Sequence, residues 1–320
     1  MDISVAEAVK HLQEGTIVAL PTETVYGLAA HALNTEALKA IFQIKGRPLT
    51  DPLIVHVLDS AEAEKLLLHP LSAKAKKLID TFWPGPLTLI LPKASHVPDL
   101  LTASKPNIAL RSPKHPVFRE ILRLSKLPLA APSANPFGYL SPTEASHVKK
   151  SLKDTPLPFY IVDGGPCEHG LESTILDLSG PQPILLRPGP ISHAALESTL
   201  GESILQPSQQ ASPASPLLAP GTLKQHYSPH TPLYLYPYGG LPESKGDRAQ
   251  VYFAKPKFIY EHSYWLSEKG SLAEAASNLF KILHLLDLKH YTAIDIESAP
   301  SEGLGISIND RLKRAAAKFS

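Results

Sequence analysis

The side chains best suited to chemistry in this sequence are two cations, Lys45 and Arg47, which flank Gly46. Asp51 follows in the same Gly- and Pro-containing loop, and the next apolar segment carries His56. Two cations fixed on such a loop can hold an anion, typically a phosphate group. On these residues alone a solvated turn is the commoner explanation. The prediction of a phosphate clamp therefore depends on the neighbouring segments.

Other polar segments lie at the ends of apolar runs that we predict to be strands. They are residues 21–28, 111–113, 132–135 and 173–175, and they contain Thr22, Arg111, Ser133, Asn135 and Ser173. In α/β proteins, ligand sites form at the ends of strands. The arrangement therefore favours one binding site made from segments that are distant in the sequence.

Capping and periodicity predict the elements that would position these residues. Ser4 and Glu7 have the spacing of a capping box and predict a first helix, which a strand over residues 16–20 follows. Asn34 is expected to cap a second helix, and the Lys45 loop lies at its C-terminal end. Cations are favourable there because the C-terminus of a helix is electronegative.

Strand and helix patterns then continue to alternate. A strand is expected over residues 53–58, a helix over 60–82, and a helix over 143–152 with Pro142 at its first position. Further short strands are predicted over residues 87–91, 108–111, 129–131, 160–163, 174–178 and 184–187. Because strands dominate the middle of this stretch, we predict an α/β fold with a twisted, mixed sheet.

The composition changes near residue 205, where Ser, Gln, Ala and Pro replace the apolar periodicity. We predict a first domain over residues 1–205, a linker over 206–230 and a small C-terminal α/β domain over 231–320. The last is expected to contain strands over 233–236, 251–254 and 293–296 and helices over 272–288 and 309–318.

Composition excludes several classes of protein. The formal net charge is +1, and basic and acidic residues are distributed evenly along the chain. No basic region therefore indicates binding of nucleic acid. The single cysteine, Cys167, excludes an internal disulfide and a zinc site built from cysteines. No signal pattern or membrane-length apolar run is present, so we expect a soluble, cytoplasmic protein. Walker-A, nucleophile-elbow and metalloprotease motifs are also absent, and no metal site is predicted.

The motifs, taken in order, resemble those of the YrdC-like threonylcarbamoyl-AMP synthases. The resemblance rests on Pro21 to Leu28, Lys45 to Val57, Trp83 to Thr88, Arg111 to Pro113, Ala131 to Asn135, Ser141 to Thr143, Ser173 to Ile175 and Arg187 to Gly189. The linker and small second domain, expected to be Rossmann-like, resemble the two-domain form of that family. The resemblance implies a YrdC-like domain with a deep cleft. It also implies a nucleotidyltransferase that converts L-threonine, bicarbonate and ATP to threonylcarbamoyl-AMP and pyrophosphate. The product would pass to the machinery that makes t6A in tRNA.

The resemblance also implies roles for individual residues. Lys45 and Arg47 would hold the ATP phosphates and carry the catalysis. Other residues would bind the nucleotide: Asp51, Ser133, Asn135, Ser141, Arg187, His226 and Tyr227. The threonine pocket would contain Thr22, His56, Arg111 and Ser173. For His56, the competing interpretation is a buried core histidine whose ring nitrogens are hydrogen-bonded within the protein.

The sequence departs from the family pattern at a few positions. Asp51 replaces the usual Asn, and it would either coordinate the Mg²⁺ that accompanies ATP or only turn the loop. Leu223 and Gln225 replace two cations of the linker motif, whereas His226 and Tyr227 match it. We expect the linker to fold over the cleft as a lid. No general base is identified, and positioning with charge neutralisation would suffice for catalysis.

Two alternatives remain open. One is an RNA-binding module that grips a duplex backbone with a concave cationic cleft, although the even charge distribution argues against it. The other is a related carbamoyl-adenylate enzyme of hydrogenase maturation, which would be much larger and carry Cys-rich domains. Direct binding of tRNA is left undecided.

Overall fold

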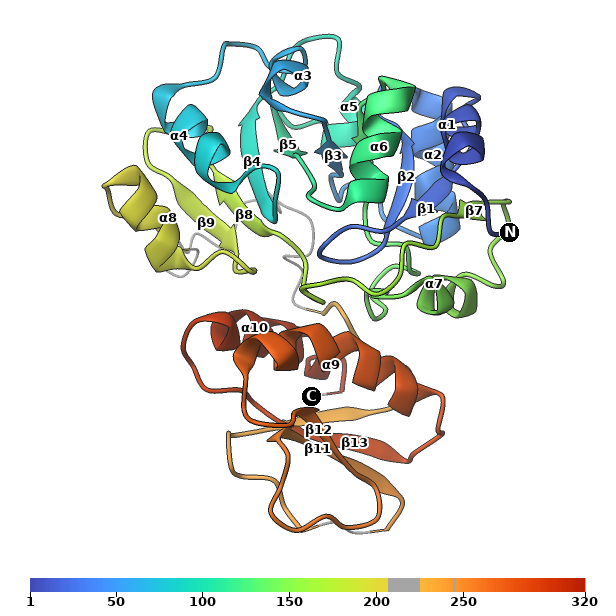
Figure 1. The fold of residues 1–320 in the computed structure, drawn as a ribbon, viewed down its shortest axis with the longest axis vertical. Coiled ribbons are helices and arrows are strands. Elements are labelled where there is room, and N and C mark those ends of the chain that lie inside the picture. Colours follow the sequence, from blue (N-terminus) through green and yellow to red (C-terminus); the bar gives the residue numbers. More distant parts are fainter. Residues whose placement is uncertain (207–224, 244–245, 320) are drawn as a thin grey trace.

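The computed structural model describes residues 1–206, 225–243 and 246–319. Figure 1 shows two units along the long axis of the molecule, each with its own sheet. We call residues 1–206 the first unit and the described residues from 225 onward the second unit. In the part of the chain that the structure describes, no helix is long and apolar enough to cross a membrane.

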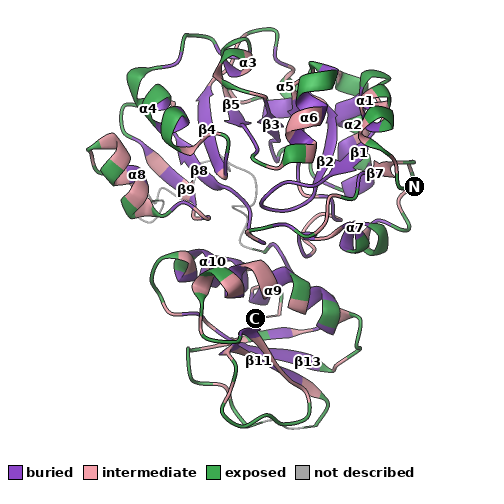
Figure 2. Ribbon diagram, in the orientation of Figure 1, coloured by how far each residue is buried: buried purple, intermediate pink, exposed green. Residues whose placement is uncertain are grey.

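The first unit is built on a nine-stranded sheet with the order β7-β1-β2-β6-β3-β5-β4-β8-β9. Its strands are β1 (Val18–Leu20), β2 (Gly27–His31), β3 (Ile54–His56), β4 (Leu87–Pro92), β5 (Asn107–Arg111), β6 (Leu129–Ala130), β7 (Tyr160–Ile161), β8 (Thr174–Asp177) and β9 (Ile184–Arg187). Parallel and antiparallel pairs alternate irregularly, which confirms the predicted mixed sheet. Figure 2 shows that the strands are mostly buried.

Helices cover this sheet. They are α1 (Val5–Gln13), α2 (Thr35–Lys45), α3 (Ser60–Glu64), α4 (Ala73–Phe82), α5 (Asp99–Thr102), α6 (Pro116–Ser125), α7 (Ala145–Ser151) and α8 (His193–Leu200). The capping box of Ser4 and Glu7 is present, and Asn34 Oδ1 accepts hydrogen bonds from two backbone N–H groups at the start of α2. Gly46 ends α2 with a φ of 62°, a conformation that glycine adopts without strain.

Several predicted boundaries were wrong. The helix expected over 60–82 is two helices, because Pro70 lies between α3 and α4 and proline cannot continue a helix. The helix expected over 143–152 begins only at Ala145, so Pro142 precedes it. Strand β2 was missed because it is rich in glycine and alanine and carries no β-branched side chain, yet it pairs with β1 as a hairpin.

The second unit contains a four-stranded, fully parallel sheet with the order β10-β13-β11-β12. Its elements are β10 (Leu233–Tyr236), β11 (Arg248–Ala254), β12 (Ser263–Ser267), β13 (Ala293–Glu297), α9 (Leu272–Asp287) and α10 (Leu304–Ala316). The sequence did not predict β12. The last helix begins at Leu304, five residues before the predicted start, with Gly303 as its N-cap residue and Gly305 in its first turn. A Cβ atom at Gly305 would lie 1.8 Å from the carbonyl oxygen of Pro300, so only glycine fits there.

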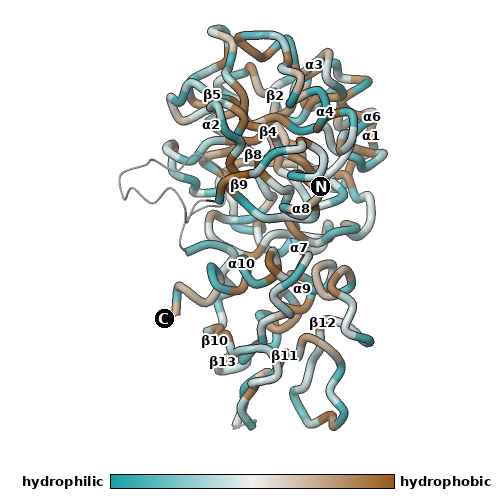
Figure 3. The backbone as a smooth tube through the Cα atoms, turned by 90° about the vertical axis from the view of Figure 1, so that its left-hand side faces the viewer, coloured by the Kyte–Doolittle hydropathy of each residue, from teal (hydrophilic) through white to brown (hydrophobic). Residues whose placement is uncertain are grey.

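Helices α9 and α10 lie between the small sheet and the first unit in both views of the molecule (Figures 1 and 3). Side-chain hydrogen bonds cross this boundary from both helices. His284 Nε2 of α9 lies 3.1 Å from the carbonyl oxygen of Ser141, and Ser307 Oγ of α10 donates to the carbonyl oxygen of Gly189 at 3.0 Å. The second unit thus presents its helical face to the first.

Candidate active site

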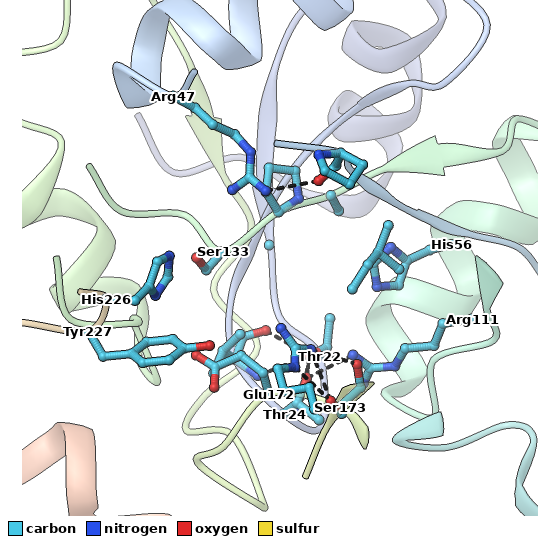
Figure 4. Close-up of a pocket in the computed structure, with 17 residues that line it drawn as sticks. Thr22, Thr24, Arg47, His56, Arg111, Ser133, Glu172, Ser173, His226 and Tyr227 are labelled. Atoms are coloured by element: carbon cyan, nitrogen blue, oxygen red, sulfur yellow. Dashed lines mark hydrogen bonds between the residues drawn. The ribbon is translucent and has the colours of Figure 1, made fainter. Parts of the chain in front are cut away.

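A cavity of about 50 Å³ lies at the strand ends of the first unit. It collects these predicted residues: Thr22, Arg47, His56, Arg111, Ser133, Ser173, Arg187, His226 and Tyr227. Figure 4 shows that the labelled side chains surround one space although they come from different elements. His56 and Arg111 are register partners on the parallel strands β3 and β5, which explains why those two side chains reach the same place.

The other predicted residues lie behind the cavity wall. Lys45 Nζ donates to the carbonyl oxygens of Ser133 and Asn135, both at 2.6 Å. The Asn135 side-chain amide donates to the carbonyl oxygens of Pro136 and Tyr139. Asp51 pairs with Arg47, and Ser141 donates to Glu172. As the structure stands, these residues position the residues that line the cavity.

Arg47 is the cation of the predicted clamp that lines the cavity. Its guanidinium donates to the carbonyl oxygens of Asp51 and Pro52 at 3.2 and 2.9 Å, which fixes its direction. Burial lowers the pKa of Arg47, and Asp51 opposes that shift. Burial, together with Arg47, lowers the pKa of Lys45 well below its ordinary value. A buried, fixed cation is costly unless an anion is near, and Asp51 of the same loop is that anion in this structure.

Arg111 is held by the loop that carries Thr22. Its Nη2 donates to Glu23 Oε1 at 2.7 Å and its Nη1 donates to Thr24 Oγ1 at 3.0 Å, while Nε donates to the carbonyl oxygen of Gly85. Burial alone would raise the pKa of Glu23, but Arg111 lowers it below its ordinary value. The guanidinium therefore lines the cavity in one fixed orientation.

Arg187 and Ser173 form a second fixed pair. Arg187 Nε and Nη2 both donate to the carbonyl oxygen of Ser173, and Nη2 also lies 3.1 Å from Ser173 Oγ. Ser173 Oγ is a further 2.7 Å from Thr88 Oγ1. Because Arg187 ends β9 and Ser173 precedes β8, the sheet itself holds this pair in place.

Comparisons with known proteins identify the family. A family model described as "Telomere recombination" matches residues 10–189, and another described as "Threonylcarbamoyl-AMP synthase, C-terminal domain" matches residues 191–317. Threonylcarbamoyl-AMP synthase of Bacillus subtilis is 39% identical over 98% of this chain and 93% of its own length. The chain belongs to the threonylcarbamoyl-AMP synthase family. The predicted family and enzyme class are thereby confirmed.

Further relatives agree on the family and on the fold. Threonylcarbamoyl-AMP synthase of Pyrococcus abyssi is 37% identical over 95% of this chain and 92% of its own length. The crystal structure of P. abyssi Sua5 complexed with L-threonine matches with a TM-score of 0.86 and 35% identity, over 98% of this chain and 94% of that one. The two-unit architecture of this synthase family is therefore present here in full, as the fold prediction required.

His56 is buried, with 2% of its surface exposed, and its Nδ1 has no hydrogen-bond partner among the described residues. Burial, aided by Arg111, lowers the pKa of His56 to about 3. The imidazole is therefore neutral at physiological pH. A core histidine with all its hydrogen bonds satisfied would have both nitrogens paired, whereas His56 lines the cavity and has one nitrogen unpaired, so its ligand-binding role stays a prediction.

His226 and Tyr227 close the cavity from the linker side. Burial, with the field of Arg47 and Lys45, lowers the pKa of His226 well below its ordinary value. Burial and Glu172 raise the pKa of Tyr227 to about 12, and its hydroxyl has no hydrogen-bond partner among the described residues. These positions agree with a lid, but movement of the lid stays a prediction. Leu223 lies outside the described residues.

Among the polar side chains that line the cavity, the sequence missed two, Thr24 and Glu172. Both adjoin motifs that were recognised, since Thr24 follows Thr22 by two positions and Glu172 precedes Ser173. Among the described residues, no group of three or more His, Cys, Asp or Glu side chains is arranged to hold a metal ion. The carboxylates around the cavity, Asp51, Glu23 and Glu172, are already paired with Arg47, Arg111 and Arg311.

Proposed function

We propose that this chain forms threonylcarbamoyl-AMP and pyrophosphate from ATP, L-threonine and bicarbonate. The observation that carries the proposal is the convergence of buried Arg47, Arg111 and Arg187 on one small cavity. These three cations suit two anionic ligands, the triphosphate of ATP and the carboxylate of threonine. The threonine complex of P. abyssi Sua5 supports an amino-acid site in the same fold.

The reaction would proceed in two steps. The amine of threonine attacks the carbon of bicarbonate, and loss of water leaves a carbamate. A carbamate oxygen then attacks the α-phosphorus of ATP, and the bond to pyrophosphate breaks. Arg47 and Lys45 would offset the charge that develops on the phosphates, and neutral His56 would orient threonine through its unpaired Nδ1.

Mg²⁺ would enter with ATP. Magnesium in such sites is usually held by phosphates and water with one or two carboxylates, and Asp51 is the carboxylate nearest the clamp cations. Asp51 would have to exchange its contact with Arg47 to reach the ion. When bound, the ion would neutralise charge on the phosphates.

ATP is too large for the cavity as it stands. The volume of about 50 Å³ is far below the roughly 300 Å³ of even a small ligand pocket, so binding of ATP requires His226 and Tyr227 to move. The formal net charge of only +1 disfavours the RNA-binding alternative, because gripping a duplex backbone needs several clustered cations. We place the enzyme in the cytoplasm, where its product would supply the tRNA threonylcarbamoyl-transferase machinery.

The test is release of pyrophosphate from ATP, with threonine and bicarbonate each omitted in turn. We expect release only when both are present, and a product whose mass is that of threonylcarbamoyl-AMP. Release that does not depend on threonine would contradict the proposal. Tight, salt-sensitive binding of RNA without turnover would support the RNA-binding alternative.

A further inference from the structure

Besides His226 and Tyr227, which line the cavity, the second unit reaches the active site through Arg311 of α10, which contacts the cavity residue Glu172. Arg311 is fully excluded from solvent, and its Nε donates to Glu172 Oε2 at 2.7 Å. Glu172 belongs to the first unit and lines the cavity. Its other carboxylate oxygen accepts a hydrogen bond from Ser141 Oγ. A chain of contacts therefore runs from α10 through Glu172 to Ser141.

The same guanidinium also contacts the linker. Its central carbon lies 5.3 Å from the centroid of the Tyr227 ring, in the range of a cation–π interaction. Burial alone would lower the pKa of Arg311, but Tyr227, Glu172 and Asp310 raise it above its ordinary value. Arg311 is therefore a permanent cation, and its Nη2 has no hydrogen-bond partner among the described residues.

Helix α10 is fixed on both sides, so Arg311 cannot easily adopt another position. Ser307 Oγ binds the carbonyl oxygen of Gly189, and Ser228 Oγ binds the carbonyl oxygen of Ala315 at 3.0 Å. The backbone N–H of His226 donates to the carbonyl oxygen of Arg314 at 3.4 Å. The linker segment with Tyr227 is thus attached to the helix that carries Arg311.

We propose that Arg311 is a positioning residue for the nucleotide site, acting through Glu172 on Ser141 and directly on the Tyr227 ring. The second unit then completes the active site of the first with a charged side chain. The inference rests on the proposed function, because Ser141 and Tyr227 were assigned to ATP. A buried ion pair that only joined the two units would serve stability alone.

A double variant separates these two roles. Arg311→Met or Glu172→Gln alone leaves one buried charge of this pair without the other and should lower both stability and activity, whereas Asp310, which also contacts Arg311, keeps its ion pair with Arg314 in each variant. Combining them removes both charges, so we expect most of the thermal stability to return. The dissociation constant for ATP, measured by calorimetry, should stay at least tenfold above that of the wild type, because Ser141 and Tyr227 have lost the groups that orient them.

The control is Arg248→Met with Asp295→Asn, which removes a less buried arginine–aspartate pair between β11 and β13 of the same unit. We expect this control to bind ATP as the wild type does. Arg311→Lys serves as a second variant if the double variant does not fold. It keeps the charge but loses the planar fork, and we expect ATP to bind several-fold more weakly.

The outcomes separate this inference from the proposed function. If the double variant folds and binds ATP as tightly as the wild type, Arg311 is structural and the inference is wrong. Should the double variant not fold, wild-type affinity in Arg311→Lys would equally show that Arg311 is structural. If the wild type binds ATP in an Arg311-dependent manner but releases no pyrophosphate with threonine and bicarbonate, the positioning role stands and the proposed reaction fails.

Discussion

Nη2 of Arg47 lies 2.9 Å from Oδ2 of Asp51, and the side chains are only 4% and 3% exposed. The two residues are four positions apart, so the loop forms this ion pair within itself. Burial raises the pKa of Asp51 above its ordinary value, and Arg47 opposes that shift. The charged form of Asp51 therefore depends on its contact with Arg47. Asp51 therefore compensates the clamp cation in the absence of an anionic ligand.

Replacing Asp51 by Asn should free Arg47 for ATP. Arg47 keeps its hydrogen bonds to the carbonyl oxygens of residues 51 and 52, so the variant should fold. We expect the KM for ATP to fall roughly three- to tenfold, since one negative charge about 4 Å from a phosphate costs about 1 kcal/mol even at the dielectric constant of water. Steady-state kinetics over a range of Mg²⁺ concentrations provides the measurement. A higher KM that excess Mg²⁺ corrects would instead identify Asp51 as a ligand of the ion.

Replacing Lys45 or Arg47 by Met should reduce kcat/KM for pyrophosphate release roughly 10- to 100-fold. Each removes charge-assisted contacts worth about 1.5–3 kcal/mol. Lys39→Met is the control, because Lys39 lies on the helix that ends at Lys45 but is exposed and pairs with Glu36 at the surface. Near-normal turnover in both clamp variants, with Lys39→Met also normal, would contradict the phosphate clamp.

His56 should make the protein sensitive to acid. Its pKa in the folded protein is about 3, below the ordinary value of 6.5, so the unfolded chain binds more protons between these values. Stability from neutral His56 is complete above about pH 6.5 and is lost as the pH falls towards 3, at up to about 1.4 kcal/mol per pH unit. Urea unfolding of wild type and His56→Gln at pH 7.5, 6.5 and 5 should show a smaller loss in the variant. If the free energy of unfolding changed equally with pH in the two proteins, His56 would already be protonated or exposed.

Replacing Arg111 by Lys should weaken the binding of threonine more than the binding of ATP. Lysine keeps the charge, but it cannot reproduce the fork that contacts Glu23 and Thr24 and faces the cavity. We expect the KM for threonine to rise about tenfold, equivalent to ~1.4 kcal/mol, with a smaller change for ATP. Arg119→Lys is the control, because Arg119 donates to the carbonyl oxygens of Leu58 and Pro113 outside the cavity. Equal effects on both substrates would assign Arg111 a structural role.

Local patterns were sufficient to predict much of this structure. The capping box of Ser4 and Glu7 and the cap at Asn34 depend on neighbours in the sequence, and both are present as expected. The positions of polar residues at strand ends also depend on the local sequence, since a strand that ends at Arg111 must place that side chain at the carboxyl end of the strand. Because such features are encoded within a few residues, they need no knowledge of the fold.

The contact of Arg311 with Glu172 could be found only in the folded molecule. These residues are 139 positions apart, and no sequence motif indicates that they pair. The pairing of Arg111 with Glu23, 88 positions away, has the same character. Which cation meets which carboxylate depends on how the sheet orders its strands and on where α10 packs, and those arrangements result from burial of apolar surface over the whole chain. The burial that lowers the pKa of His56 also results from packing of the whole chain. For this reason the sequence predicted where His56 lies but not whether its imidazole is charged.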